Sequence, residues 1–506
     1  MNGLQPSDHK RKTILLIIIS SIIRLLLSGI VELNNDEVYY WTYAKELQWN
    51  YFDHPPLVGV CIRFFTAGLH WNHEFFIRLA SVIGAAISTW LIYLSGKSLS
   101  SERTGWIAAC LFTASFYSSV IAGLLILPDS PQMVFWMLSV YLIIRIAGSK
   151  RSFSININLI LLGISIGLCI LSKVHGIFCW LGFGGFILFH KRSLLKNPFL
   201  YISALITAAM LVPSFLWTIS NKMSTVDYHG SRILIRHFQF DSFIRELLGS
   251  FAYNNPLNVI LLVASLVALK WKLKQYSLIL WLGLPLILTV IFLSLFNDTL
   301  PHWSGPAYST LILLTAARLS GINSRKVKKW TTAGISLTAG VLLTAICIIN
   351  YWPGTLGNKS IPDFGKHDIT LDMSGWRNFG KDFSNLYKED KKSAKDSPRF
   401  IFSNYWFPAA HLDFYVARPI GLFVKGIGDI NAIHHFAWLN EKLPELKPGE
   451  DAYYIGISNF YEPVPEAITK RFSEVSAPVS IPQIRNGKVA RYFYVYRLKG
   501  YKEMVE

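Results

Sequence analysis

Long apolar segments separated by short polar connections occupy roughly the first 350 residues of the chain. Eleven of them are long enough to cross, or nearly cross, a hydrocarbon core of about 30 Å. We expect them at about residues 13–33, 75–96, 104–125, 131–147, 155–172, 175–190, 198–219, 255–271, 276–296, 302–320 and 330–351. The pattern predicts an all-α polytopic membrane domain over residues 1–351, with outer loops at 34–74 and 220–254.

A further apolar stretch, residues 56–70, is short and opens with the pair Pro55-Pro56. Counting it as a span would invert every later loop of the membrane domain. We therefore expect it to form a juxtamembrane helix that lies along the outer surface.

Residues 352–506 show a different pattern. Alternation of apolar and polar residues over 399–406, 451–458 and 491–498 predicts strands. Helical periodicity near 374–390 and 430–443 separates them. The pattern predicts a small soluble α/β domain, whose dense aromatic residues serve core packing more often than glycan stacking.

Composition supports a membrane protein. Only 16% of residues are charged, whereas a soluble chain carries roughly a quarter. The net charge of +18 first suggests either nucleic acid or a membrane as the cause. Residues 1–350, the apolar part, hold 28 basic and 13 acidic side chains, which is the opposite of a nucleic-acid-binding domain. The five cysteines all lie in apolar segments, so no disulfide framework is indicated.

The basic residues also orient the chain. With the amino terminus in the cytoplasm, nineteen of them fall on the inner side, as the positive-inside rule requires. They are Lys10, Arg11, Lys12, Lys97, Arg103, Arg145, Lys150, Arg151, Lys191, Arg192, Lys196, Lys270, Lys272, Lys274, Arg318, Arg325, Lys326, Lys328 and Lys329. We therefore expect a multi-pass protein of a plasma membrane, the inner membrane in a bacterium, with residues 352–506 outside the cytoplasm.

On this topology a few ionisable residues gather at the outer membrane surface. Asp36 and Glu37 follow the first span, and Asp53-His54 precedes the proline pair. Asp129 stands where the fourth span re-enters, and Lys173 at the outer end of the fifth. Ionisable groups at this depth are costly and are candidates for function.

These residues resemble a known family. Asp36-Glu37, the run Tyr51–Leu57 (YFDHPPL), Asp129 and Ser172-Lys173 match in order and spacing, with a weaker match at Pro301–Pro306 (PHWSGP). The chain is similar to GT-C membrane glycosyltransferases of the protein O-mannosyltransferase and lipid A aminoarabinose transferase kind, especially bacterial members of families 39 and 83. The resemblance covers most of residues 1–320.

The resemblance implies transfer of a sugar from a polyprenyl phosphate, undecaprenyl phosphate in a bacterium, onto an acceptor hydroxyl outside the membrane. The acceptor is expected to be lipopolysaccharide, another envelope glycolipid or glycan, or a protein. A single inverting displacement needs a base and charge stabilisation on the departing phosphate. Asp36 matches the family's catalytic Asp and is the expected base. Glu37 points about 100° away on a helix and is a supporting or helix-end residue.

The departing phosphate needs cations. We expect Lys173, His54, Arg232 and Arg236 to supply them, with Asp53, Asp129 and His302 in supporting positions. The expected reaction does not itself require a cofactor. Some relatives hold a divalent cation such as Mg²⁺ or Mn²⁺, and none is assigned here; if one is present, Asp36, Asp53 and Asp129 are its expected ligands.

Simpler interpretations stand beside these roles. Asp36 could cap its helix, and Asp53-His54 could form a turn before a proline-started helix. Asp129 could cap the fourth span or pair with a basic group, and Lys173 could extend to the interface. Basic residues at 232–245 could belong to an amphipathic helix on the membrane.

Two other classes of function remain open. A transporter or flippase of a lipid-linked sugar would also have many spans, although its internal repeats are not evident here. A non-catalytic protein of envelope assembly would not need the ordered acidic and basic set. The transferase is the first choice, with a lipid-linked sugar donor, an envelope acceptor and the bilayer as partners.

Overall fold

A computed structural model of the chain describes residues 8–221, 223, 225–226, 230, 237–268, 276–393 and 398–502. The chain divides into two compact units. The helical unit comprises Met1–Ser28 and Leu47–Leu342, and the mixed unit comprises Gly29–Glu46 and Leu343–Glu506. The segment that carries Asp36 therefore packs with the carboxyl-terminal residues, whereas the sequence placed it within a domain of residues 1–351.

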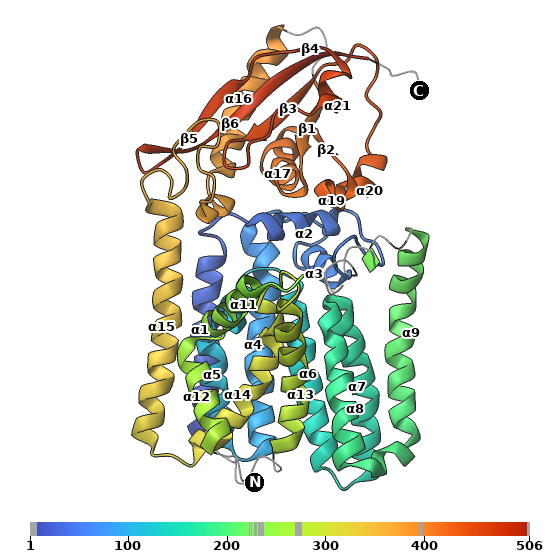
Figure 1. Ribbon diagram of the computed structural model, residues 1–506, viewed down its shortest axis with the longest axis vertical. Helices are drawn as coiled ribbons and strands as arrows, with labels where there is room; N and C mark the ends of the chain where they lie inside the picture. The colour runs from blue at the N-terminus through green and yellow to red at the C-terminus, as the bar shows by residue number, and fades with distance from the viewer. Residues whose placement is uncertain are drawn as a thin grey trace. The chain divides into compact units, whose positions relative to one another are not determined.

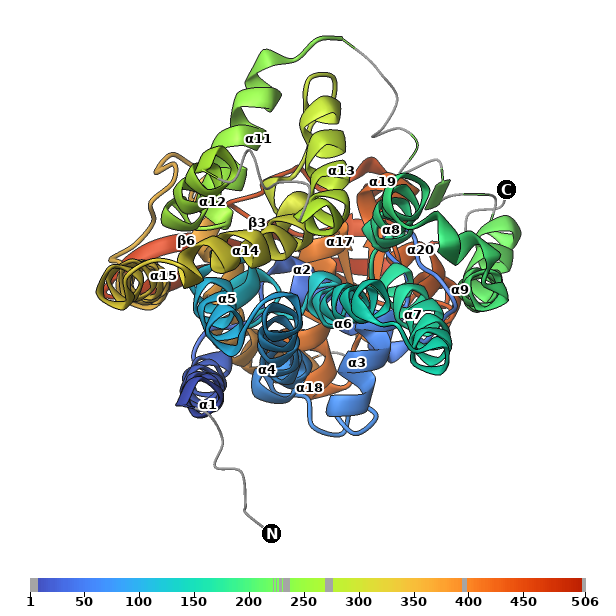
Figure 2. The same ribbon diagram turned by 90° about the horizontal axis from the view of Figure 1, so that it is seen from below.

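The helical unit is built from long, roughly parallel and antiparallel helices with short turns between them (Figures 1 and 2). Its elements are α1 (Asp8–Ser28), α3 (Leu57–Phe65), α4 (Glu74–Leu99), α5 (Glu102–Ala114), η1 (Tyr117–Ile121), α6 (Asp129–Gly148), α7 (Ser152–Ser172), η2 (Val174–Gly176), α8 (Ile177–His190), η3 (Arg192–Lys196), α9 (Pro198–Ser220), α11 (Phe240–Tyr253), α12 (Pro256–Ala268), α13 (Ser277–Ser294), η5 (Pro301–Ser304), α14 (Gly305–Ser320) and α15 (Ser324–Tyr351), whose last turns belong to the mixed unit.

Each of the eleven apolar segments expected from the sequence overlaps a helix of this unit. Among the described residues, six helices are long and apolar enough to cross a membrane: α4, α6, α7, α9, α13 and α15. A seventh span is added if α11 and α12, which meet at 100°, count as one. The expected number of about eleven spans stays a prediction. The short helix α3, Leu57–Phe65, confirms a helix within the stretch 56–70, and its place along the outer surface stays a prediction.

The helices approach closely where glycine allows it. A Cβ atom at Gly105 of α5 would lie 2.4 Å from the Tyr93 carbonyl oxygen of α4. Only glycine therefore lets these two backbones pack directly. The core between the helices is filled by large apolar side chains, including the fully buried Trp136 of α6.

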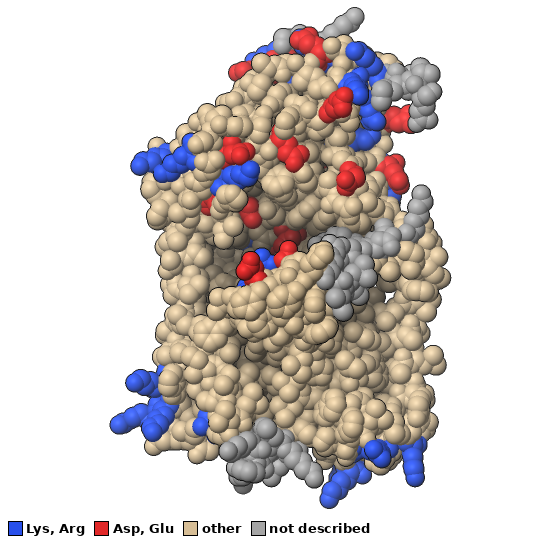
Figure 3. Space-filling model, in the orientation of Figure 1, with Lys and Arg blue, Asp and Glu red and all other residues tan. Residues whose placement is uncertain are grey.

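Basic side chains gather at one end of the helical unit, below a band nearly free of charge (Figure 3). Lys191 donates hydrogen bonds to the carbonyl oxygens of Ile146 and Ala147 at the carboxyl end of α6, at 2.9 and 2.8 Å. A cation is favoured there because the carbonyl groups of a last helical turn are unpaired and carry partial negative charge. Lys97 pairs with Glu102 at 2.7 Å in the neighbouring α4–α5 connection.

The mixed unit is organised around a six-stranded sheet. The order β2-β1-β3-β6-β4 is parallel across β2, β1 and β3 and antiparallel from β3 onward, and β5 also pairs with β6. The strands are β1 (Phe400–Asn404), β2 (Phe423–Ile427), β3 (Ala452–Ile457), β4 (Phe472–Val475), β5 (Val479–Arg485) and β6 (Lys488–Tyr501). The helices are α2 (Asn35–Lys45), η6 (Ile369–Met373), α16 (Trp376–Ser393), α17 (Trp406–His411), η7 (Leu412–Ala417), α18 (Arg418–Ile420), α19 (Ile430–Ile433), α20 (Phe436–Glu441) and α21 (Glu466–Thr469).

The three strands and two helical regions expected in this unit correspond to β1, β3, β6, α16 and the pair α19–α20. Strands β2, β4 and β5 were not expected. Burial along β5 does alternate, but a proline interrupts it at Pro482, and β4 has only four residues. Such short or interrupted strands give little periodic signal.

Candidate functional site

The helical unit holds a buried ion pair between two of the predicted site residues. Asp129 begins α6, and Lys173 directly follows α7 as its C-cap residue. Because α6 and α7 are antiparallel neighbours, these ends meet. The Lys173 Nζ atom lies 2.9 and 3.0 Å from the two Asp129 carboxylate oxygens, and each side chain is only 3% exposed. The buried Lys173 side chain therefore does not extend to the interface. Asp129 forms an ion pair with it and does not cap α6.

Tyr117, which the sequence did not single out, belongs to the same group. Its hydroxyl donates a 2.9 Å hydrogen bond to Asp129 Oδ1. A Cβ atom at Gly305 would lie 2.4 Å from the Tyr117 ring, so the glycine opens the space the ring occupies. Gly305 stands in the PHWSGP motif. A glycine is needed there because the Tyr117 ring packs against it, so the motif was the signal that could have pointed to Tyr117.

Three other predicted residues, His302, Asp53 and His54, belong to the helical unit. His302, in η5, is within electrostatic range of both Asp129 and Lys173. The turn containing Asp53 and His54 leads into α3, which packs against α6 and α7. Asp53 is buried and His54 is half-buried. The structure thus brings Asp129, Lys173 and His302 together and places the Asp53–His54 turn before a helix in contact with the same two spans.

Asp36 lies in the first turn of α2, in the mixed unit. The helix is capped by Asn34, whose side chain accepts a 2.8 Å hydrogen bond from the Glu37 backbone N–H. Glu37 completes the capping box by accepting a 3.1 Å bond from the Asn34 backbone N–H. Asn34 therefore fills the capping role that could have explained Asp36. The fully buried Glu37 also stabilises the helix start.

The remaining predictions concern two arginines and a divalent cation. Arg232 and Arg236, expected at the donor phosphate, lie outside the described residues. Within the described ranges, no group of three or more His, Cys, Asp or Glu side chains is arranged to hold a metal ion. A divalent cation stays a prediction, and no chemical step is assigned to one.

A segment in the first half of the chain matches a known family profile. A sequence profile of the dolichyl-phosphate-mannose-protein mannosyltransferases matches residues 53–217. That range contains Asp53, His54, Asp129 and Lys173, and it begins after Asp36.

Two curated relatives bear the names of sugar transferases. The lipid A galacturonosyltransferase RgtD of Rhizobium johnstonii is 23% identical over 54% of this chain and 58% of its own. An undecaprenyl phosphate-alpha-4-amino-4-deoxy-L-arabinose arabinosyl transferase of Pseudomonas aeruginosa is 27% identical over 54% of this chain and 51% of its own. The chain spans about half the length of the curated relatives it matches.

The fold likeness extends over nearly the whole chain. ArnT from Cupriavidus metallidurans superposes with a TM-score of 0.61 in its apo state and 0.64 bound to undecaprenyl phosphate. Each comparison covers 95% of this chain and 97% of that one, at 12% and 13% identity. The protein therefore has the GT-C fold. Together with the profile and the two relatives, this confirms the resemblance to the GT-C membrane glycosyltransferases.

Proposed function

We propose that the protein transfers a sugar from a polyprenyl phosphate, undecaprenyl phosphate in a bacterium, to a hydroxyl group of an envelope glycolipid outside the cytoplasm. The transfer is a single inverting displacement. Asp36 takes the proton of the acceptor, while Lys173 and His54 stabilise the charge on the departing phosphate. Related proteins bear names for lipid A and undecaprenyl phosphate chemistry, which favours a glycolipid over a protein as the acceptor.

The Asp129–Lys173 pair is the observation that carries this proposal. Burying an ammonium group between two apolar helices costs free energy unless the charge is paired. The Asp129 carboxylate supplies that pairing. The carboxylate also fixes the position of Nζ, and an ammonium has three N–H donors. A preorganised cation in a site of low dielectric is suited to a phosphate whose charge increases as its sugar leaves.

An assay with the purified full-length protein tests the function. We expect sugar transfer from at least one undecaprenyl-phosphate sugar to a glycolipid extracted from a bacterial envelope, detected by mass spectrometry. A transporter would bind the same donor and release it unchanged. Donor binding without transfer to any glycolipid, glycan or protein of the extract would contradict the proposal.

Placing the acceptor outside the cytoplasm predicts the topology of the mixed unit. In a chain whose five cysteines are replaced, Asn385→Cys on the exposed side of α16 should react with a membrane-impermeant thiol reagent in intact cells. Lys150→Cys, in the connection between α6 and α7, is the matched control and should react only after lysis. The reverse pattern of labelling would overturn the proposed orientation.

A further inference from the structure

Residues 29–46 are embedded in the mixed unit along their whole length. Glu32 accepts hydrogen bonds from the backbone N–H groups of Trp376 and Arg377, at 2.8 and 3.0 Å, where α16 begins. The Tyr39 hydroxyl accepts a 3.2 Å bond from the His435 backbone N–H. Lys45, at the far end of α2, pairs with Asp413. Helix α2 therefore has its position set by the carboxyl-terminal part of the chain.

Asn35, the residue before Asp36, is held at both ends of its side-chain amide. His411 Nε2 lies 3.0 Å from Asn35 Oδ1. The Asn35 side chain is also near enough to the Asp372 carboxylate to lower its pKa. Because an ionised carboxylate only accepts, the Asn35 NH₂ group must face Asp372. Oδ1 then faces His411, whose Nε2 must carry the proton and donate.

The protonation state of His411 agrees with this assignment. The imidazole is fully buried, and it stacks on Trp376 with ring centroids 4.2 Å apart. Burial, together with the nearby Arg491, holds the pKa of His411 well below its usual value, so the ring is neutral. Its buried Nδ1 has no hydrogen-bond partner among the described residues, which fits a ring whose single proton sits on Nε2.

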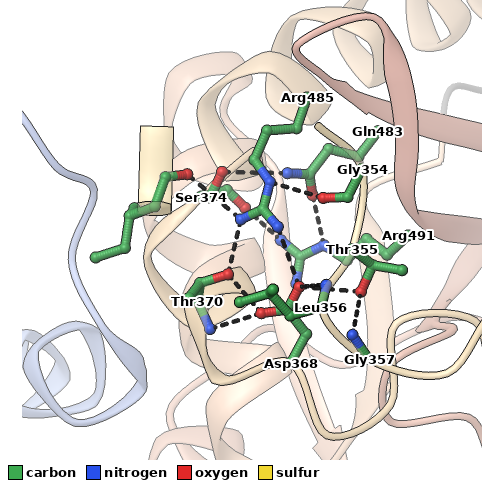
Figure 4. A network of polar contacts seen from close by, with 11 residues as sticks. Gly354, Thr355, Leu356, Gly357, Asp368, Thr370, Ser374, Gln483, Arg485 and Arg491 are labelled. Atoms are coloured by element: carbon green, nitrogen blue, oxygen red, sulfur yellow. Dashed lines mark hydrogen bonds and ion pairs between the residues drawn. The ribbon is translucent and has the colours of Figure 1, made fainter. Parts of the chain in front are cut away.

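Asp372 lies in the short helix η6, between Asp368 and Ser374. These two flanking residues belong to a network of hydrogen bonds and ion pairs (Figure 4). Asp368 forms a buried ion pair with Arg485 of β5 at 3.1 Å and caps η6 through the Thr370 N–H at 3.0 Å. Arg491 of β6 donates a 2.9 Å bond to the Ser374 carbonyl oxygen. Two arginines from adjacent strands thus fix both ends of the turn that presents Asp372.

We propose that Asn35 is a positioning residue for Asp36, clamped by Asp372 and His411, and that the mixed unit serves transfer by fixing this helix start. The inference rests on the proposed function, in which Asp36 is the general base. A base must be placed within a few tenths of an ångström of the proton it takes, and support of this kind is what holds such geometry. The clamp acts through Asn35 and needs no contact with either substrate.

Paired substitutions in the full-length protein test the clamp. Asp372→Leu and His411→Leu each remove one partner of Asn35, whereas Asp372→Asn and His411→Gln each keep a group able to make the same bond. We expect the two Leu variants to lower kcat by about ten- to a hundredfold with the donor KM unchanged. The Asn and Gln variants should recover most of the activity. Hydrogen exchange of the α2 amides should be faster only in the Leu variants.

Asp390→Leu is the matched control. Asp390, on α16, accepts hydrogen bonds from Arg497 and Tyr453, so its loss also removes a paired carboxylate from this unit. It should lower the melting temperature and leave kcat and α2 exchange near wild type.

The stability of Asp372→Asn separates positioning from general structural support. Burial raises the pKa of Asp372 to about 6, more than Arg491 and Asn35 lower it. The ionised form therefore costs stability as the pH rises through this value. At pH 7.5 the Asn variant should melt no lower than wild type.

Several outcomes would overturn the inference. One is a loss of kcat in the Leu variants no greater than in Asp390→Leu at equal loss of melting temperature. Another is failure of the Asn and Gln variants to restore activity. If the wild-type protein transfers no sugar, the proposed function is wrong. Unchanged hydrogen exchange of the α2 amides in the Leu variants would separately contradict the clamp.

Discussion

Replacing Asp36 with Asn is expected to lower kcat for sugar transfer by about 10²–10⁴-fold, the contribution of a general base. Asn keeps the size and polarity of the side chain but cannot take the proton of the acceptor. The start of α2 should be retained, because the hydrogen bonds that cap it join Asn34 and Glu37, which the substitution leaves unchanged. The measurements are turnover in the transfer assay, the melting temperature and equilibrium binding of undecaprenyl phosphate.

Glu46→Gln provides the matched control for this substitution. Glu46 directly follows α2 and pairs with Lys442 through a partly exposed contact. Exposed pairs contribute about 0–1 kcal/mol, so the variant should retain near wild-type turnover and stability. Asp36→Asn with turnover within tenfold of wild type would exclude Asp36 as the base.

The sequence predicted the apolar helices and placed Asp129 and Lys173 at the same end of the helical unit. Hydropathy and sorted basic residues placed the ends of α6 and α7 on the same side, and this is where Asp129 meets Lys173. The contact itself joins residues 44 positions apart. Periodicity reports which face of a helix is apolar, and not which polar residue of another helix it meets.

The environment of Asp36 was less accessible from the sequence. Residues 29–33 were expected to end the first span and residues 34–46 to begin a membrane-domain loop, yet Leu33, Glu32 and Tyr39 bond to residues more than three hundred positions later. The Tyr415 hydroxyl, for example, accepts a 2.8 Å bond from the Leu33 N–H. Asp372 and His411 belong to no sequence motif. Each acts through a contact with Asn35, which lies more than three hundred residues earlier. Tyr117 was missed for the same reason, although Gly305 marks the space for its ring.

Removing Lys173 alone should strongly destabilise the helical unit. Among the described residues, Lys173→Met leaves the buried Asp129 carboxylate with one side-chain hydrogen-bond donor, the Tyr117 hydroxyl. Breaking a buried pair from one side costs about 3–5 kcal/mol. We expect a large fall in melting temperature together with loss of transfer. That result does not separate an ion pair that supports the fold from a cation that binds the donor phosphate.

The double variant Asp129→Leu, Lys173→Met separates the two roles. Replacing both partners of a buried pair by apolar residues of similar volume is often neutral or stabilising, so the melting temperature should return to near wild type. A hydrogen bond to a charged group contributes about 1.5–3 kcal/mol, so a lost phosphate contact should still raise the donor KM by about ten- to a hundredfold. If the double variant recovers donor KM and turnover as well as stability, the pair is purely structural. The departing phosphate must then be bound by other cations, among which His54 would be the next to replace.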